Sequence, residues 1–348
     1  MLAIGLLIAA FLDAEGLRKQ AQIQPQGFQR RLALDLTRPL VSVSRRLHLT
    51  TPRHELQVAI GRQSEDVINT TINLPPSAGP VAPPHPAASS RPAGPKPGHR
   101  VVSTPNTTPK TTPETTPRPA SKPKPPAKQV FTPAHPLKVW VAGDSLAEVP
   151  GEGLERLPLR SLDILPVESR LSTGLARPDL YNWFTRFSQV IAQLHPRVAV
   201  LSFGADDAHS YMSGVPAGHT VGAFGSPSWV AEYRRRVDGV TRELAAAGIY
   251  TVWLGLPIPD GPGFRESFPV VNSILESVVK AHPAVSTYVD TWKLLEGAHG
   301  RYTAYLRVHG KLTLMRLPDG VHYTGAAGDL IAQQTLAQLR RVFVIKPS

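Results

Sequence analysis

The chain has 348 residues, contains no cysteine and carries a formal net charge of +12. The absence of cysteine excludes disulfides, thiolate nucleophiles and cysteine-ligated metal sites. The charge is uneven: +3 over residues 1–74, +7 over 75–136 and +2 over 137–348. Because the C-terminal part is nearly neutral, we expect no nucleic-acid partner. The basic middle stretch suits an anionic surface, such as a cell wall or lipid headgroups, or its lysines serve only to keep it solvated.

The N-terminal region, residues 1–74, begins with the apolar run Leu2–Leu12. This run has the length of a signal-peptide core and is too short to span a bilayer as a helix. Three interpretations stay open: a signal or anchor, an anchor truncated at its start, or a helix packed on a partner. Residues 14–66 have the spacing of amphipathic helices, so we expect a helical region associated with a membrane.

Residues 75–136 form a compositionally distinct stretch that holds more than half of the 36 prolines, mixed with Thr, Ser, Ala and Lys. Such a composition cannot bury enough apolar surface to offset its chain entropy, which predicts a disordered linker. The folded domain is therefore expected over residues 137–348.

In that domain apolar runs alternate with helical patterns. We expect strands at residues 139–142, 162–167, 197–203, 249–256 and 285–289, helices at 181–194, 229–247, 268–281 and 325–343, and a hairpin over 301–316 that turns at His309-Gly310. This alternation predicts an α/β fold in which a five-stranded, mostly parallel sheet is covered by helices on both faces. Ligand sites in such sheets lie beyond the carboxyl ends of the strands.

Two motifs carry the chemistry of an acyl-transfer enzyme. Gly143-Asp144-Ser145-Leu146 follows the first predicted strand, and Asp319-Gly320-Val321-His322 lies near the C-terminus. A serine hydroxyl becomes nucleophilic when a neighbouring base takes its proton, and His322 is the natural base. Asp319 lies close enough in sequence to orient the imidazole. Asp144 is a rival partner for the histidine, although we favour it as a residue that forms the turn.

The motifs resemble those of SGNH (GDSL-type) hydrolases over residues 137–348. The stretch 202–216 and the segment 225–229 further resemble a bacterial envelope branch with a membrane tether and a Pro-rich spacer. The resemblance implies a three-layer, flavodoxin-like α/β/α domain that acts as an esterase or O-acyltransferase. It assigns the oxyanion hole to Ser145, Gly174 and the position of Asp206. His209, on the loop that follows, is a candidate substrate-binding residue.

The main departure from the family is Asp206, which stands where the Gly-x-Asn-Asp motif has an amide donor. An ionised carboxylate only accepts hydrogen bonds and repels an oxyanion. Three outcomes stay open: Asp206 is protonated, it turns aside, or the enzyme is slow or inactive. Among neighbouring residues, Trp229 and Tyr233 are expected in the core, and the run Arg234–Arg236 is expected to be solvated charge.

The sequence therefore predicts a membrane-tethered, extracytoplasmic serine esterase or O-acyltransferase that needs no cofactor. Its expected substrate is an acylated envelope glycan or a small ester. No cluster of His, Asp and Glu has the spacing of metal ligands, so no metal site is predicted. Two alternatives remain: a catalytically impaired envelope protein that binds or organises cell-wall material, and a lipase-like enzyme that acts on long acyl chains.

Overall fold

The computed structural model describes residues 10–23, 28–47, 49, 68–75, 128–207, 211–216 and 218–347. Most of the apolar run Leu2–Leu12 and all of the stretch 76–127 lie outside these residues, as does His209. The predictions made for those segments therefore stay predictions.

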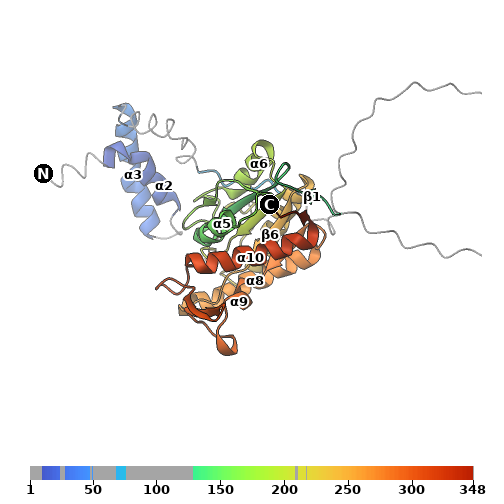
Figure 1. Cartoon of the computed structure of the whole chain (residues 1–348). Coiled ribbons are helices and arrows are strands. Elements are labelled where there is room, and N and C mark those ends of the chain that lie inside the picture. Colours follow the sequence, from blue (N-terminus) through green and yellow to red (C-terminus); the bar gives the residue numbers. More distant parts are fainter. Residues whose placement is uncertain are drawn as a thin grey trace, which may run out of the picture.

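Two helices in the N-terminal region, α2 (Ala14–Ile23) and α3 (Phe28–Arg46), lie side by side in Figure 1. The Ser44 hydroxyl on α3 donates to the Phe11 carbonyl at 2.6 Å, and the contact buries Ala14 and Val41. Leu32, Leu36 and Val43, apolar side chains on α3, remain exposed. Among the described helices, none combines the length and apolarity needed to cross a membrane.

The central sheet has the strand order β3-β2-β5-β6-β7, with every neighbouring pair parallel. Numbered along the sheet strands alone this order is 2-1-3-4-5, the flavodoxin-like arrangement that the resemblance implied. The α/β fold class is therefore confirmed. The strands are β2 (Leu137–Gly143), β3 (Leu162–Ile164), β5 (Val198–Ser202), β6 (Tyr250–Leu254) and β7 (Ser286–Val289).

The second predicted strand is interrupted. β3 ends at Ile164, and a short strand β4 (Glu168–Ser169) pairs with the last two residues of β2. Leu165 still donates to the Val139 carbonyl at 2.8 Å, but Pro166 has no N–H and cannot extend the ladder. The chain therefore leaves the sheet and returns beside the carboxyl end of β2.

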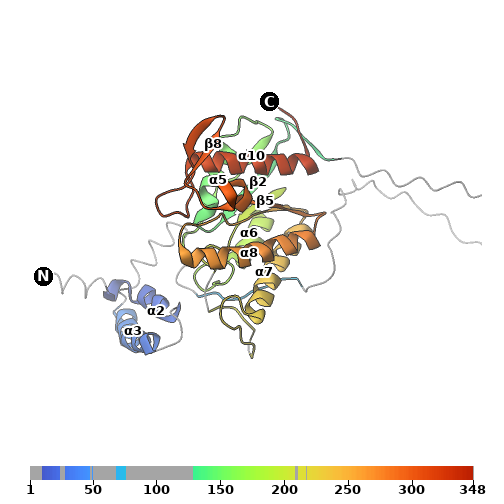
Figure 2. The same ribbon diagram turned by 90° about the horizontal axis from the view of Figure 1, so that it is seen from below.

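Helices cover both faces of the sheet. Figure 2 shows α5 and α10 on one side of β2 and β5, and α6, α7 and α8 on the other. Their bounds are α5 (Glu148–Glu155), α6 (Trp183–Gln193), α7 (Pro227–Ala246), α8 (Pro262–Ala281) and α10 (Gly325–Val342). The smaller elements are β1 (Val130–Phe131), η2 (Ser145–Ala147), α9 (Thr291–Leu294), η3 (Ala298–Gly300), β8 (Tyr305–Val308), β9 (Lys311–Leu314) and β10 (Val344–Ile345). β8 and β9 form the predicted hairpin, and β1 pairs in parallel with β10.

Helix α5 was not expected, because Pro150, Gly151 and Gly153 lie within it. Pro150 falls in the first turn, where backbone N–H groups lack intrahelical partners, so it removes no hydrogen bond. Gly153 lets α5 approach α10 closely, since a Cβ there would lie 2.4 Å from the Gly328 carbonyl oxygen. Tertiary contact thus outweighs the poor helix propensity of this segment.

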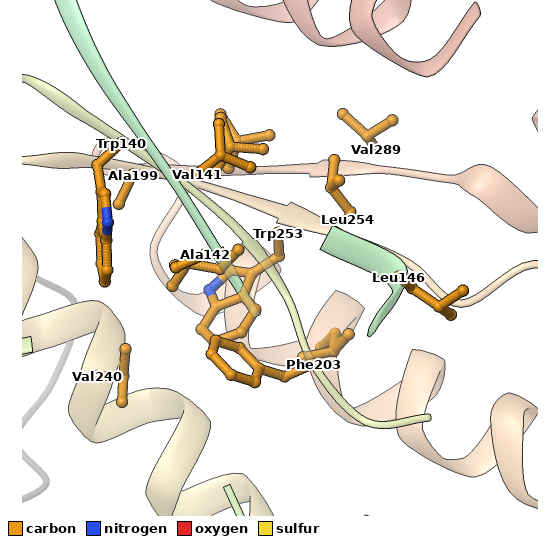
Figure 3. Close-up of a cluster of buried hydrophobic side chains, with 14 of the residues drawn as sticks. Trp140, Val141, Ala142, Leu146, Ala199, Phe203, Val240, Trp253, Leu254 and Val289 are labelled. Carbon is orange, nitrogen blue, oxygen red and sulfur yellow. The ribbon is translucent and has the colours of Figure 1, made fainter. Parts of the chain in front are cut away.

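Part of the hydrophobic core lies between the sheet and α6–α7, and it includes the aromatic side chains of Trp140, Phe203 and Trp253 (Figure 3). Trp140 on β2 packs edge-on against Phe187, and Phe203 contacts Trp253 with ring centroids 6.3 Å apart. The Trp253 indole N–H donates to Thr241 Oγ1 on α7 at 3.0 Å. Dense packing of this kind fixes the positions of the strand ends from which the loops of the site begin.

Candidate active site

The site lies where the order of the sheet reverses, between β2 and β5. The polypeptide leaves β2 toward one side of the sheet and β5 toward the other, which opens a crevice at the carboxyl ends of these strands. Ser145 lies two residues after the end of β2, and Gly204-Ala205-Asp206-Asp207 begins two residues after the end of β5. The motif that contains Ser145 and the turn that contains Asp206 therefore both lie at the edge at which α/β proteins bind their ligands.

Ser145, His322 and Asp319 form a continuous hydrogen-bonded chain, although 177 positions separate the serine from the histidine. Ser145 Oγ lies 2.8 Å from His322 Nε2, and His322 Nδ1 lies 2.8 Å from Asp319 Oδ2. With the proton on Nδ1, Asp319 accepts from the ring and Nε2 accepts the serine hydroxyl. This is the arrangement of nucleophile, base and orienting acid that serine hydrolases require.

Asp319 is held as an ionised acceptor. Partial burial opposes ionisation, but the N–H groups of Val321 and His322 and the His322 ring outweigh it and lower the pKa of Asp319. Its side chain is 48% exposed and that of His322 is 39% exposed. The His322–Asp319 pair therefore faces solvent.

A buried arginine that the sequence analysis did not identify supports the turn carrying His322. Arg316 Nη1 donates to the Val321 carbonyl at 2.7 Å, and Nη2 donates to the Ile258 carbonyl at 3.0 Å. Its guanidinium also lies over the Tyr323 ring, 5.1 Å from the ring centroid. No short motif marks such a residue, because its carbonyl partners are recognisable only once the chain is folded.

Asp144 forms the turn rather than partnering His322. Its side chain is fully buried and accepts from the N–H groups of Leu146 at 3.0 Å, Gly204 at 3.0 Å and Ala205 at 3.1 Å. Burial raises the pKa of Asp144, the nearby Asp206 charge adds to the rise, and the backbone N–H groups oppose it. The carboxyl thereby joins the turn after β2 to the turn after β5.

Gly174 lies on a loop that starts at β4 and is fixed by Asp207. The Asp207 carboxylate accepts from Leu175 N–H at 3.1 Å and Ala176 N–H at 2.8 Å, and a Cβ at Gly174 would lie 2.0 Å from its Oδ1. Ser169, where the loop begins, donates to the Asp144 carbonyl at 3.1 Å. Both ends of the Gly174 loop are therefore bonded to turns that surround Ser145.

The carbonyl side of the same loop is held by Arg236 on α7. Arg236 Nη1 donates to the Leu175 and Ala176 carbonyls at 2.7 and 3.1 Å, and its side chain is fully buried. The expectation of solvated charge over Arg234–Arg236 is therefore wrong for Arg236. Tyr233, one turn earlier, is buried as expected and donates its hydroxyl to Asp207. Burial raises the pKa of Tyr233, so the hydroxyl keeps the proton that it donates.

The remaining predicted residues are placed less completely. Asp206 is half-buried on the turn after β5, close enough to Asp144 to raise its pKa. His209 lies outside the described residues. Within the part of the chain that the structure describes, no three His, Asp or Glu side chains are grouped so that they could hold a metal ion.

Several solved structures resemble the chain. The structure of TesA is 17% identical with a TM-score of 0.40, and the match covers 59% of this chain and 99% of that one. The esterase EstA from Pseudoalteromonas sp. is 13% identical with a TM-score of 0.39, covering 59% and 97%. A catalytic mutant of Axe2, an acetylxylan esterase from Geobacillus stearothermophilus, is 13% identical with a TM-score of 0.40, covering 61% and 96%.

No curated protein matches this sequence. The protein family of unknown function DUF459 matches residues 138–338, which is more than half of the chain and includes both Ser145 and His322. The chain belongs to the DUF459 family.

Proposed function

We propose that this protein is a serine ester hydrolase in which Ser145 is the nucleophile, His322 the general base and Asp319 the orienting acid. The observation that carries the proposal is the unbroken chain of hydrogen bonds through these side chains, at 2.8 Å for each link. These three side chains lie at the carboxyl edge of the sheet, and those of His322 and Asp319 are partly exposed to solvent. A carbonyl substrate can therefore reach the Ser145 hydroxyl.

In the first half-reaction Ser145 Oγ attacks the ester carbonyl carbon while His322 Nε2 takes the hydroxyl proton. The imidazolium that forms is stabilised by the ionised Asp319 carboxylate. The carbonyl oxygen becomes an oxyanion, and we assign the N–H groups of Ser145 and Gly174 as its donors. Ser145 opens the short helix η2, where the first N–H groups have no intrahelical acceptor.

Collapse of the tetrahedral intermediate breaks the ester C–O bond, and His322 returns its proton to the leaving alcohol. An acyl group then remains on Ser145 Oγ. In the second half-reaction water, or a sugar hydroxyl in a transferase, attacks this acyl carbonyl while His322 takes its proton. The second tetrahedral intermediate then collapses, the bond between the acyl carbon and Ser145 Oγ breaks, and His322 returns the proton to Oγ as the carboxylic acid or the new ester leaves. The balance of atoms needs no cofactor.

For the substrate we propose O-acyl groups on an envelope glycan, or small esters of similar size. Support comes from the sequence: the N-terminal apolar run suggests association with a membrane, and the basic stretch 75–136 suits an anionic cell wall. These features also support an extracytoplasmic location.

The proposal is tested by the release of p-nitrophenol from short acyl esters. The wild-type protein should turn over, Ser145→Ala should lose at least about 10³-fold in kcat, and Ser188→Ala, an exposed serine on α6, should be unchanged. A fluorophosphonate should label Ser145 and should label no other serine of the chain. Equal turnover by wild type and Ser145→Ala would refute the proposal, and a series of acyl lengths would separate an esterase from a long-chain lipase.

A second candidate function is favoured by Asp206. A carboxylate at a position from which an amide usually donates removes one oxyanion donor, and one donor typically contributes 10² to 10³ in rate. The protein would then be an envelope protein that binds glycan with the same crevice and turns over slowly or not at all. Glycan binding that persists in Ser145→Ala, without ester cleavage by the wild type, would support this alternative.

A further inference from the structure

An extended segment that precedes the proline-rich stretch lies against the catalytic domain. Residues 68–75 run beside α6 and α7 (Figure 2), more than 100 positions before those helices in sequence. Their side chains alternate from Thr71 onward: Thr71 and Asn73 are exposed, whereas Ile72 and Leu74 pack against the hydrophobic core. This alternation is what an extended chain shows when one face lies on a surface.

Polar contacts fix the register of this segment. The Asn182 side-chain amide donates to the Asn69 carbonyl at 2.8 Å and to the Thr71 carbonyl at 3.0 Å. The Asn69 side-chain amide donates to Thr185 Oγ1 at 3.1 Å. Asn182 is also the N-cap of α6 and accepts from Thr185 N–H at 3.0 Å. One asparagine therefore begins the helix and binds the backbone of the segment.

Two glycines provide the room that the segment occupies. A Cβ at Gly239 on α7 would lie 2.6 Å from Leu74 Cδ1 and 2.9 Å from Leu74 Cβ, and its three nearest atoms all belong to Leu74. A Cβ at Gly214 would lie 2.6 Å from the Thr70 carbonyl oxygen. The domain surface is thus shaped to accept this stretch of backbone and these side chains.

We propose that residues 68–75 form a strap that is docked on the surface of α6 and α7 and is an integral part of the α/β domain. The segment that covers this surface is therefore part of the same chain. The proposal does not depend on the proposed function, since it concerns only which residues form the domain.

The strap changes how the parts of the chain are connected. The proline-rich stretch 76–127 starts at the strap and ends beside β1, whose residues pair with β10 on the same domain. Both flanks of this stretch therefore contact the same domain, so the stretch joins two points of one domain. The connection to the N-terminal helices is then residues 47–67, which span at most about 75 Å when fully extended.

Because the protein has no cysteine, the docking can be tested in the full chain with an engineered pair, Leu74→Cys with Gly239→Cys. The two β-carbons lie close enough that a small shift permits a disulfide. The control pair is Ser90→Cys with Gly239→Cys. We expect mild oxidation to join residues 74 and 239 at least tenfold faster than the control pair, seen as a mobility shift and a cross-linked peptide. Equal rates for the two pairs would overturn the proposal.

A second measurement avoids any new covalent bond. Gly239→Ala places a methyl group against Leu74, whereas Gly263→Ala on α8 meets no atom within 4 Å. Hydrogen exchange of peptides covering residues 68–75 should accelerate at least tenfold in Gly239→Ala and remain at the wild-type rate in Gly263→Ala. Unchanged exchange in Gly239→Ala, with cross-linking no faster than the control, would show that the strap does not dock.

Discussion

Replacement of Gly174 by alanine is the most direct test of how the oxyanion loop is built. The backbone of Gly174 is compatible with alanine, since it is not among the residues with positive φ. The added Cβ would nevertheless lie 2.0 Å from Asp207 Oδ1 and 2.5 Å from its Cγ. Ordinary contact begins near 3.4 Å, so the loop or the carboxylate has to move by about 1.4 Å.

Asp207 cannot move by that amount without breaking contacts. Its two oxygens accept from Leu175 and Ala176, and Tyr233 donates to it as well. A shift of about 1 Å in a catalytic group can cost 10²-fold in rate, and loss of one oxyanion donor costs 10² to 10³. We therefore expect kcat to fall by 10² to 10³ while KM changes by no more than a few-fold. Overpacking should lower the free energy of unfolding by about 1–3 kcal/mol.

The assay is steady-state cleavage of p-nitrophenyl acetate, with circular dichroism at the assay temperature to show that the variant is folded. Gly263→Ala is the matched control, because its new methyl group has no neighbour within 4 Å. Its kcat should equal that of the wild type. A folded Gly174→Ala variant with kcat within threefold of wild type would show that this loop does not hold the oxyanion.

Three further outcomes are expected. Asp206→Asn should keep or raise kcat/KM, by up to about 10² if the amide donates to the oxyanion; a tenfold loss would show that this position is wrongly assigned. Arg316→Met should lower the free energy of unfolding by about 1–3 kcal/mol in thermal melts and also lower kcat, since two buried carbonyls lose a donor; unchanged kcat would contradict its positioning role. Asp319→Asn should lower kcat between about 10² and 10⁴-fold. The same change should lower the free energy of unfolding by less than about 1 kcal/mol, because solvent screens the exposed pair. Since the folded pKa of Asp319 is lowered, this difference should be present above about pH 4 and should vanish as acid protonates the wild-type carboxyl. A stability difference that grew in acid would refute this reasoning.

The parts of the fold that could be predicted from the sequence are those that depend on local patterns. β2, β5 and β6 are fully buried apolar runs, or nearly so, and such runs are visible without any knowledge of their neighbours. Helix α5 was missed because Pro150 and the glycines argue against a helix, and only the contact of Gly153 with Gly328 explains them. Local propensity cannot report a close approach between segments that are distant in sequence.

The same distinction applies to the site. Ser145 and His322 lie in short motifs whose order along the chain indicated their chemistry. Arg236 and Arg316 are buried among backbone carbonyls, and nothing in their sequence neighbourhood distinguishes them from surface arginines. Buried arginines of this kind become recognisable only when the carbonyls they bind are known.

The loops of the site are held by one chemical device used repeatedly. Asp144 accepts from N–H groups of its own turn and of the turn after β5, and Asp207 accepts from the Gly174 loop. Asp319 accepts from the N–H groups of Val321 and His322, and its second oxygen accepts from the His322 ring. Loops lack the regular bonding of helices and strands, so their N–H groups need other acceptors, and the carboxyl oxygens of these three residues supply them. Replacing any one of these carboxylates should therefore disturb the loops before it disturbs the sheet.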